Sequence, residues 1–152
     1  MPRPLLLVED NEDDVFFFQF ALRKLGLPHP LVVARDGREG LRWMQDSVAA
    51  SAPFALVLLD LKLPYLDGLE LLAWLQALPP AQRSPVVVLT TSEKQSDAQH
   101  ALRLGAAEVR VKPNRPDQLV EVLRELDAKW LREPLGVPVR AGMPLQPAGG
   151  VK

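Results

Sequence analysis

The stretch Ala55-Leu-Val-Leu-Leu-Asp60 decides the fold, because it is an unbroken apolar run that ends in a carboxylate. The run Leu5-Leu-Leu-Val8 has the same form and ends in the acid pair Glu9-Asp10. Runs of this kind are typical of strands that are buried on both faces of a parallel sheet. Ligands bind at the carboxyl ends of the strands in an open parallel sheet, so the three acids are expected to meet at one edge.

Three further runs rich in branched residues predict three more strands, at Leu31–Ala34, Val86–Leu89 and Val109–Val111. The second run is followed by the hydroxyl of Thr90 and the third by the ammonium of Lys112. Three carboxylates, a hydroxyl and an ammonium at one edge of a sheet can together hold Mg²⁺ and a phosphoryl group.

Helical patterns alternate with the five strands, which predicts five β–α units with right-handed crossovers in a doubly wound α/β sandwich. In the first helix, Asp13 and Asp14 fit the role of N-terminal caps, and Gly26 is expected to end it. The fourth helix is expected to start at a hydroxyl cap, Ser96, and the fifth to start with Pro116. The predicted helices are Asp13–Leu25, Arg38–Asp46, Gly68–Leu78, Ser96–Leu104 and Pro116–Leu131.

The composition is that of one globular domain without thiol chemistry. The chain has 152 residues, of which 47% are hydrophobic and 24% charged, so it can bury a core. It has no cysteine, which excludes disulfides, thiolate catalysis and zinc–thiolate sites. The net charge of -1 gives no reason to expect binding to nucleic acid or a membrane. Neither a signal peptide nor an apolar stretch of membrane-spanning length is recognisable, so a cytoplasmic protein is expected.

The last part of the chain has a different character. Residues 132–152 hold four prolines and four glycines and show no apolar periodicity. Such a segment cannot easily bury enough surface to offset the entropy of ordering it. We therefore expect one domain over residues 4–131, followed by a flexible Pro/Gly-rich tail over residues 132–152.

Four motifs carry a resemblance to a known family. They are Val8-Glu9-Asp10-Asn11, Leu59-Asp60-Leu61-Lys62-Leu63-Pro64 with Asp67-Gly68, Leu89-Thr90-Thr91-Ser92 and Val111-Lys112-Pro113. In this order and spacing the chain resembles, from Leu5 to Leu131, the receiver domain of two-component response regulators. The resemblance implies a flavodoxin-like (CheY-like) α/β fold, with parallel strands in the order 2-1-3-4-5 and five helices. The Leu-Thr-Thr-Ser string and the lack of an output domain are most similar to stand-alone regulators that are paired with phytochrome-type histidine kinases.

The function implied by the resemblance is that of a single-domain response regulator in a phosphorelay. Asp60 would accept a phosphoryl group from a sensor histidine kinase, with a bacteriophytochrome as the candidate, in a Mg²⁺-dependent reaction. A carboxylate can attack phosphorus and form an acyl phosphate. Apart from its own phosphorylation and dephosphorylation, the protein is not expected to be an enzyme. The simpler interpretation of Asp60 is a helix cap or a solvated acid at the end of a strand.

The family's Mg²⁺ site corresponds to four residues of this chain. Asp10 and Asp60 would coordinate the ion directly, the main-chain carbonyl of Lys62 would give a third oxygen, and Glu9 would act through water. Mg²⁺ prefers hard oxygen ligands in an octahedron and keeps several waters, and clustered acids repel one another without a cation. The alternative is that the acids after the first strand only cap the following helix.

The resemblance assigns three further residues to the site and its switch. Lys112 would pair with the phosphoryl oxygens, positioned by a cis peptide before Pro113. Thr90 would be the switch hydroxyl that turns inward to a phosphoryl oxygen. Val109, the other switch position, departs from the family, which usually carries Tyr or Phe there; an aliphatic side chain cannot couple to the hydroxyl in the same way. The simpler interpretations are a surface lysine at a strand exit and a β-branched residue that ends a strand.

The first predicted helix carries a cluster of phenylalanines. The residues that helical spacing turns toward the core are Val15, Phe18, Leu22 and Leu25. Phe16, Phe17 and Phe20 are left wholly or partly on the other side, and clustered exposed aromatics usually mark interfaces. The family's kinases dock beside this helix, so these three are the candidate kinase-docking residues. The alternative is that the tail or a neighbouring element buries them.

A homodimer is also expected. Receivers without an output domain often pair through the fourth helix, the fifth strand and the fifth helix. The predicted fifth helix adds a broad apolar stripe with a large aromatic at its far end, and such aromatics are enriched at interfaces. The stripe consists of Leu119, Val122, Leu123, Leu126, Trp130 and Leu131. The alternative is that Trp130 anchors the tail against its own domain.

Two other functions fit the same pattern less well. A phosphorylation-independent interaction module on this fold is favoured only by Val109, because none of the acids or the lysine of the motifs is lost. An aspartyl-phosphate phosphatase of the haloacid-dehalogenase type needs a second acid two residues after its nucleophile, where this chain has Lys62.

Overall fold

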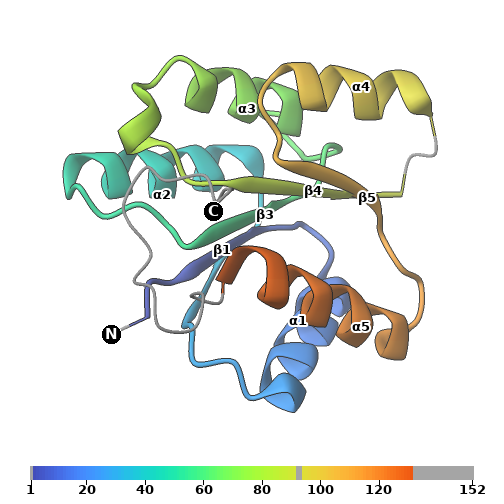
Figure 1. Cartoon of the computed structure of the whole chain (residues 1–152). Coiled ribbons are helices and arrows are strands. Elements are labelled where there is room, and N and C mark those ends of the chain that lie inside the picture. The colour runs from blue at the N-terminus through green and yellow to red at the C-terminus, as the bar shows by residue number, and fades with distance from the viewer. Residues whose placement is uncertain (1, 92–93, 132–152) are drawn as a thin grey trace.

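The computed structural model describes residues 2–91 and 94–131, so the predicted tail at residues 132–152 lies outside the described residues. Strands and helices alternate along the described chain (Figure 1). The strands are β1 (Leu5–Val8), β2 (Leu31–Ala34), β3 (Leu56–Leu59), β4 (Val86–Thr90) and β5 (Glu108–Val111). The helices are α1 (Glu12–Leu25), α2 (Gly37–Ala49), α3 (Gly68–Gln76), α4 (Gln95–Arg103) and α5 (Pro116–Leu126), with a 3₁₀ turn at Pro80–Gln82 and a π-helical turn at Asp127–Leu131.

The strands form one parallel sheet in the order β2-β1-β3-β4-β5, which is the order that the resemblance implied. β1 pairs on both sides, so that Leu5 lies opposite Leu31 of β2 and Leu56 of β3. The chain moves from β1 to one edge and then returns to the other side of β1, and the strand order therefore reverses between β1 and β3. In a doubly wound sheet, ligands bind beside this reversal, outside the carboxyl ends of the strands.

Two layers of helices cover the sheet, with α1 and α5 on one face and α2, α3 and α4 on the other (Figure 1). Side chains alternate along β1, so Leu5 and Leu7 pack on the α1–α5 side, whereas Leu6 and Val8 pack on the opposite side. The inner strands β1, β3 and β4 are buried along their whole length, which explains their unbroken apolar runs. Within the described residues, none of the helices combines the length and apolarity that a membrane span requires.

The first helix confirms the predicted core face and shows how its two ends are fixed. The core residues Val15, Phe18 and Leu22 are buried and Leu25 packs against them. Gly26 ends the helix with a φ of 66°, a left-handed conformation that glycine adopts without a steric penalty. At the other end the N-cap is Asn11, whose side chain accepts the amide hydrogen of Asp14 at 3.0 Å. The cap role predicted for Asp13 and Asp14 is therefore wrong, because the helix begins earlier.

Two other helix ends also differ from the prediction. Lys94, in an extended conformation, is the N-cap of α4 and makes no side-chain cap bond, so the hydroxyl of Ser96 lies inside the first turn instead of preceding it. The predicted fifth helix is not uniform to Leu131, because α5 ends at Leu126 and continues as the wider π-helical turn. In this turn Lys129 and Trp130 both reach Glu108 of β5, which ties the end of the helix to the edge strand.

Candidate metal and phosphoryl site

The candidate site lies where four strands end at one edge of the sheet. Glu9 and Asp10 follow β1, and Asp60 follows β3. Thr90 is the last residue of β4, and Lys112 follows β5 directly. Residues that are far apart in the sequence meet here because parallel strands present their carboxyl ends at the same edge.

Three carboxylates converge at this edge. One oxygen from each of Glu9, Asp10 and Asp60 lies within 4.8 Å of the others. Glu9 is buried, Asp60 is only 9% exposed, and Asp10 faces the solvent. Hard oxygen donors at this spacing, open to water on one side, suit a divalent cation such as Mg²⁺ that keeps part of its hydration shell. The structure therefore brings together the three acids that the sequence predicted to bind metal.

The side chain of Lys112 is 8% exposed, and its ammonium lies against two of these three carboxylates. Its Nζ lies 2.6 Å from Glu9 Oε1 and 3.0 Å from Asp60 Oδ2. A further carboxylate oxygen, Oδ2 of Asp14, lies 3.1 Å from the same nitrogen. The amide of Lys112 donates to the carbonyl oxygen of Thr90 at 2.8 Å, which continues the pairing of β4 and β5 up to the site.

The peptide bond between Lys112 and Pro113 is trans, because the described residues contain no cis peptide bond. The cis bond that the resemblance implied is therefore wrong for this structure. The trans form is favoured by about 0.5–1 kcal/mol even before proline.

The charges at the site shift one another's ionisation. Burial raises the pKa of Glu9, although hydrogen bonds from Lys112 and Asn11 and the charge of Lys112 act against this. Burial acts to lower the pKa of Lys112, but the hydrogen bond to Glu9 and the charges of Asp60 and Glu9 outweigh it and raise the pKa above its usual value. Lys112 is therefore a fixed positive charge at neutral pH.

The loop between β3 and α3 holds Asp60 in place. Asp60 Oδ1 accepts the amide hydrogen of Lys62 at 3.2 Å, while the side chain of Lys62 is exposed. Gly68 begins α3 so close to the site that a Cβ there would lie 2.5 Å from the carbonyl oxygen of Asp60. Asp67 caps α3 in a capping box with Glu70. The Asp67-Gly68 pair thus starts α3 against the backbone of Asp60.

The two predicted switch residues lie on neighbouring strands. Thr90 is buried at the end of β4. Val109 of β5 pairs in register with Val88 and is partly buried against the core beneath α2, α3 and α4. Valine has no ring that could swing between an inward and an outward position, so an aromatic switch is absent at this position.

The candidate docking residues on α1 differ in exposure. Phe16 is 56% exposed and Phe20 is also exposed, whereas Phe17 is partly buried against the core. The rings of Phe16 and Phe17 meet edge to face, with centroids 5.7 Å apart, and Lys24 Nζ lies 5.9 Å from the centroid of Phe20. A groove between α1 and α5 begins at Phe20 and Lys24 and continues to Val120. Two of the three phenylalanines, Phe16 and Phe20, are therefore exposed, and Phe20 also lines the groove.

A polar network joins β5 to the end of α5. Glu108 accepts hydrogen bonds from Arg110, Lys129 and the indole N–H of Trp130, the last at 3.2 Å. Arg110 also donates to Glu125 of α5 at 2.6 Å. Burial acts to raise the pKa of Glu108, but the three donors outweigh it and lower the pKa. Trp130 is thus held by its own chain, although its side chain stays partly exposed.

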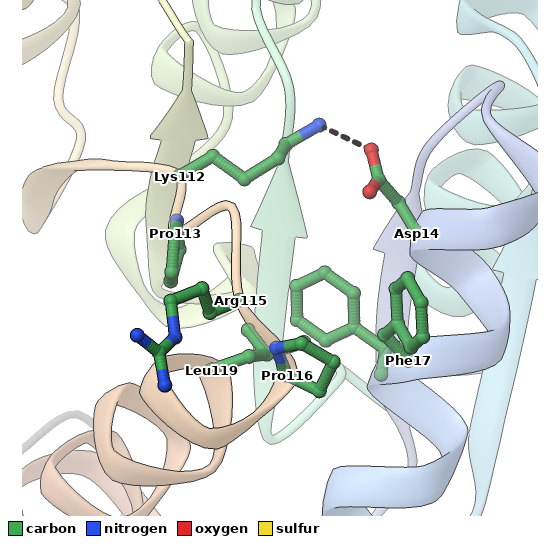
Figure 2. A pocket seen from close by; sticks show the side chains of 8 residues that line it. Asp14, Phe17, Lys112, Pro113, Arg115, Pro116 and Leu119 are labelled. Carbon is green, nitrogen blue, oxygen red and sulfur yellow. Dashed lines mark hydrogen bonds and ion pairs between the residues drawn. The ribbon is translucent and has the colours of Figure 1, made fainter.

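Asp14 is the residue of the site that the sequence did not predict. Figure 2 shows its carboxylate, on α1, in contact with the ammonium of Lys112, and both residues line a small pocket together with Phe17 and Pro113. The position of Asp14 in the helix is the sequence feature that could have predicted its place at the site. Asp14 is the third residue of a helix that begins just after the acid pair and its cap residue Asn11, and it points back toward that pair because helical side chains lean toward the N-terminus.

Comparison with known proteins assigns the family. The family described as response regulator receiver domain matches residues 5–124. Response regulator Rcp1 of Synechocystis sp. is 33% identical over 132 residues, which cover 86% of this chain and 90% of that protein. The chain therefore belongs to the response regulator receiver domain family. It is a signalling component of a two-component system and not an enzyme of the haloacid-dehalogenase type.

Solved structures of similar proteins share the fold. The phosphorylated cyanobacterial phytochrome response regulator RcpA superposes with a TM-score of 0.77 at 34% identity, covering 86% of this chain and 95% of RcpA. The Mn²⁺-bound form of Rcp1 gives a TM-score of 0.76 at 32% identity, covering 92% of this chain and all of the other. The bacteriophytochrome response regulator AtBRR gives 0.68 at 36% identity, covering 90% and 99%. The predicted fold class is thereby confirmed.

Proposed function

We propose that this response regulator accepts a phosphoryl group on Asp60 from the phosphohistidine of a sensor histidine kinase, with Mg²⁺ bound beside it. The observation that carries the proposal is the convergence of Glu9, Asp10 and Asp60 with the Lys112 ammonium at one sheet edge. An oxygen of Asp60 forms a bond to phosphorus while the phosphorus–nitrogen bond breaks, and the bonding pair stays on the imidazole nitrogen. Transfer of this kind depends on positioning and charge neutralisation more than on covalent machinery.

The metal ligands that we propose are Asp10, Asp60 and the main-chain carbonyl of Lys62, with Glu9 acting through water. The spacing of the three carboxylates supports this assignment, as does the exposure of Asp10, which leaves room for water on the ion. The Mn²⁺-bound form of the relative Rcp1 also supports a divalent ion. When bound, Mg²⁺ supplies positive charge beside the transferred phosphoryl group.

Lys112 and Thr90 are proposed to receive the phosphoryl oxygens. The Lys112 ammonium already contacts Asp60 Oδ2, so an oxygen of the phosphoryl group can take over that contact with little movement. The hydroxyl of Thr90, at the end of the adjacent strand, would donate to another phosphoryl oxygen. The acyl phosphate then biases a two-state surface that a partner reads. Because Val109 carries no ring, we propose that this surface changes through Thr90 and the packing of Val109, without an aromatic swing.

The kinase that we propose is of the phytochrome type, because the similar RcpA and AtBRR are phytochrome response regulators. Its docking surface would be Phe16, Phe17 and Phe20 of α1, of which Phe20 lines the groove between α1 and α5. The receiver domain would span residues 4–131. This partner implies a cytoplasmic location, which fractionation of cells would check.

We also propose a homodimer through α4, β5 and α5. Three large apolar side chains are exposed here: Leu102 on α4, Val111 on β5 and Trp130 in the π-helical turn after α5. The apolar stripe on α5 that is free for a partner is narrower than the sequence predicted, because Leu119 and Leu123 are buried in the protein's own core.

The test of the proposed function is phosphorylation of the Asp60→Asn variant by a phosphorylated kinase and by acetyl phosphate. The substitution keeps the shape of the side chain and removes the anionic nucleophile, so incorporation of phosphate should fall to background. Asp46→Asn is the matched control, since it removes an exposed carboxylate on α2, on another part of the surface. Full labelling of Asp60→Asn would exclude Asp60 as the acceptor. A wild-type protein that takes up no phosphate with Mg²⁺ present would favour the phosphorylation-independent module.

A further inference from the structure

We propose that Asp14 is a positioning residue that holds the Lys112 ammonium at the site both before and after phosphorylation. This inference rests on the proposed function, because it assigns a task to the lysine in phosphoryl transfer. Neither the motifs nor the acid triad include Asp14, and it reaches the site from α1 and not from the end of a strand.

The geometry places the Asp14 carboxylate by means of the helix cap. The Asn11 side chain accepts the amide hydrogen of Asp14 at 3.0 Å, and the Asn11 amide donates to Glu9 Oε2 at 3.1 Å. The start of α1 is therefore fixed to the site at Glu9. From this position Asp14 Oδ2 lies 3.1 Å from Lys112 Nζ (Figure 2).

The other two partners of the ammonium have competing tasks. Glu9 and Asp60 both belong to the group of acids whose oxygens are close enough to share a cation, and Asp60 is also the proposed phosphate acceptor. Among the described residues, that group does not contain Asp14. When the cation and the phosphoryl group draw on the oxygens of Glu9 and Asp60, Asp14 is the carboxylate that stays committed to Lys112.

The expected contribution is moderate. The Asp14 side chain is 31% exposed while that of Lys112 is 8% exposed, so solvent screens the pair in part. A partly exposed ion pair of this kind is expected to change the rate about 3- to 5-fold. Removing a group that touches the reacting atoms should lower the rate more than removing Asp14.

The first experiment measures the rate constant for phosphorylation by acetyl phosphate at saturating Mg²⁺. Asp14→Asn should lower it about 3- to 5-fold, and Asp14→Glu should restore part of the loss because it keeps the charge. Asp13→Asn is the matched control, since Asp13 is an exposed acid in the same first turn of α1. It loses the same charge near the same helix end, and its rate should stay at the wild-type value.

The second experiment tests whether Asp14 acts through Lys112. In a Lys112→Met background, adding Asp14→Asn should cause no further loss of rate. In the unphosphorylated protein, the ¹⁵N-edited NMR signal of the Lys112 ammonium should broaden in Asp14→Asn through faster proton exchange, and should be unchanged in Asp13→Asn. This signal decides the matter if Lys112→Met is phosphorylated too slowly to measure.

The outcomes separate this inference from the proposed function. If the wild type is not phosphorylated, the proposed function fails and the role of Asp14 fails with it. If the wild type is phosphorylated but Asp14→Asn behaves like Asp13→Asn in rate and ammonium signal, only the role of Asp14 is overturned. A loss of rate that is fully additive with Lys112→Met would show that Asp14 does not act through the lysine.

Discussion

At the scale of single residues, the site holds more negative than positive charge. Glu9, Asp60 and Asp14 all contact one ammonium, and Asp10 adds a fourth carboxylate beside them. Like charges at these distances destabilise the folded protein unless a cation lies among them. The same excess of acid that suits a divalent cation should therefore make the folded state more stable when the ion is bound.

Mg²⁺ should bind weakly, and Asp10→Ala should eliminate the binding, because Asp10 is a proposed direct ligand. At ten times its dissociation constant, the ion should raise the free energy of unfolding of the wild type by about 1.4 kcal/mol. Titration calorimetry and thermal unfolding with and without Mg²⁺ measure the two effects. Asp13→Ala, which removes a nearby acid in the first turn of α1, should bind Mg²⁺ like the wild type. Equal affinity in Asp10→Ala and the wild type would remove Asp10 from the site.

The site residues at the ends of strands were predicted from the sequence, and the contact that Asp14 of α1 makes with Lys112 was not. Asp60, Thr90 and Lys112 each follow or end an apolar run, and the topology of a parallel sheet brings such positions together. The contact of Asp14 with Lys112 depends on where α1 begins and how its side chains lean, which composition and periodicity do not fix. The trans peptide before Pro113 likewise departs from what the resemblance implied.

At the scale of elements, the strands were easier to predict than the helix ends. β1, β3 and β4 are buried on both faces, so their sequences carry a continuous apolar signal. Helix ends depend on local competition between backbone and side chains, and the hydroxyl of Ser96 shows that a good cap residue can lie inside a first turn. The π-helical turn after α5 brings Trp130 within hydrogen-bonding distance of Glu108, a contact between elements that helical periodicity does not contain.

The exposed face of α1 should matter for the kinase and not for the chemistry. Phe16→Ala should slow phosphoryl transfer from the phosphorylated kinase by about tenfold, since an exposed aromatic anchor of an interface often contributes more than 1 kcal/mol. Its rate with acetyl phosphate should be unchanged, because Phe16 does not contact the site. Trp43→Ala, which removes an exposed aromatic of α2 on the opposite face of the sheet, is the control. Equal slowing with both phosphate donors would place the effect in the site and not in docking.

At the scale of the whole molecule, the fold could be predicted almost completely, because four motifs in a fixed order specify one sheet topology. The association of two copies could not be predicted in the same way. Most of the apolar stripe on α5 serves the protein's own core, and the Trp130 indole is bound by Glu108 of the same chain. What remains for a partner is the exposed set Leu102, Val111 and Trp130.

The proposed homodimer should appear in light scattering at micromolar concentration as twice the monomer mass of 16.9 kDa. Replacing Leu102 by Asp on α4 should shift the mass toward the monomer, because it puts a charge into the apolar set. Trp43→Asp, which places the same charge at an exposed aromatic of α2 outside this set, should not. A mass near 16.9 kDa for the wild type, with and without phosphorylation, would rule the dimer out.

The central claim is that Asp60 carries the phosphoryl group, and the most direct measurement is to locate the group chemically. Borohydride reduces an aspartyl phosphate to homoserine, which peptide mass spectrometry assigns to one position. After phosphorylation with Mg²⁺ the account predicts homoserine at position 60 and nowhere else, and none when Mg²⁺ is chelated. Homoserine at another acid, or phosphate that resists borohydride and remains on a hydroxyl or histidine, would contradict the account.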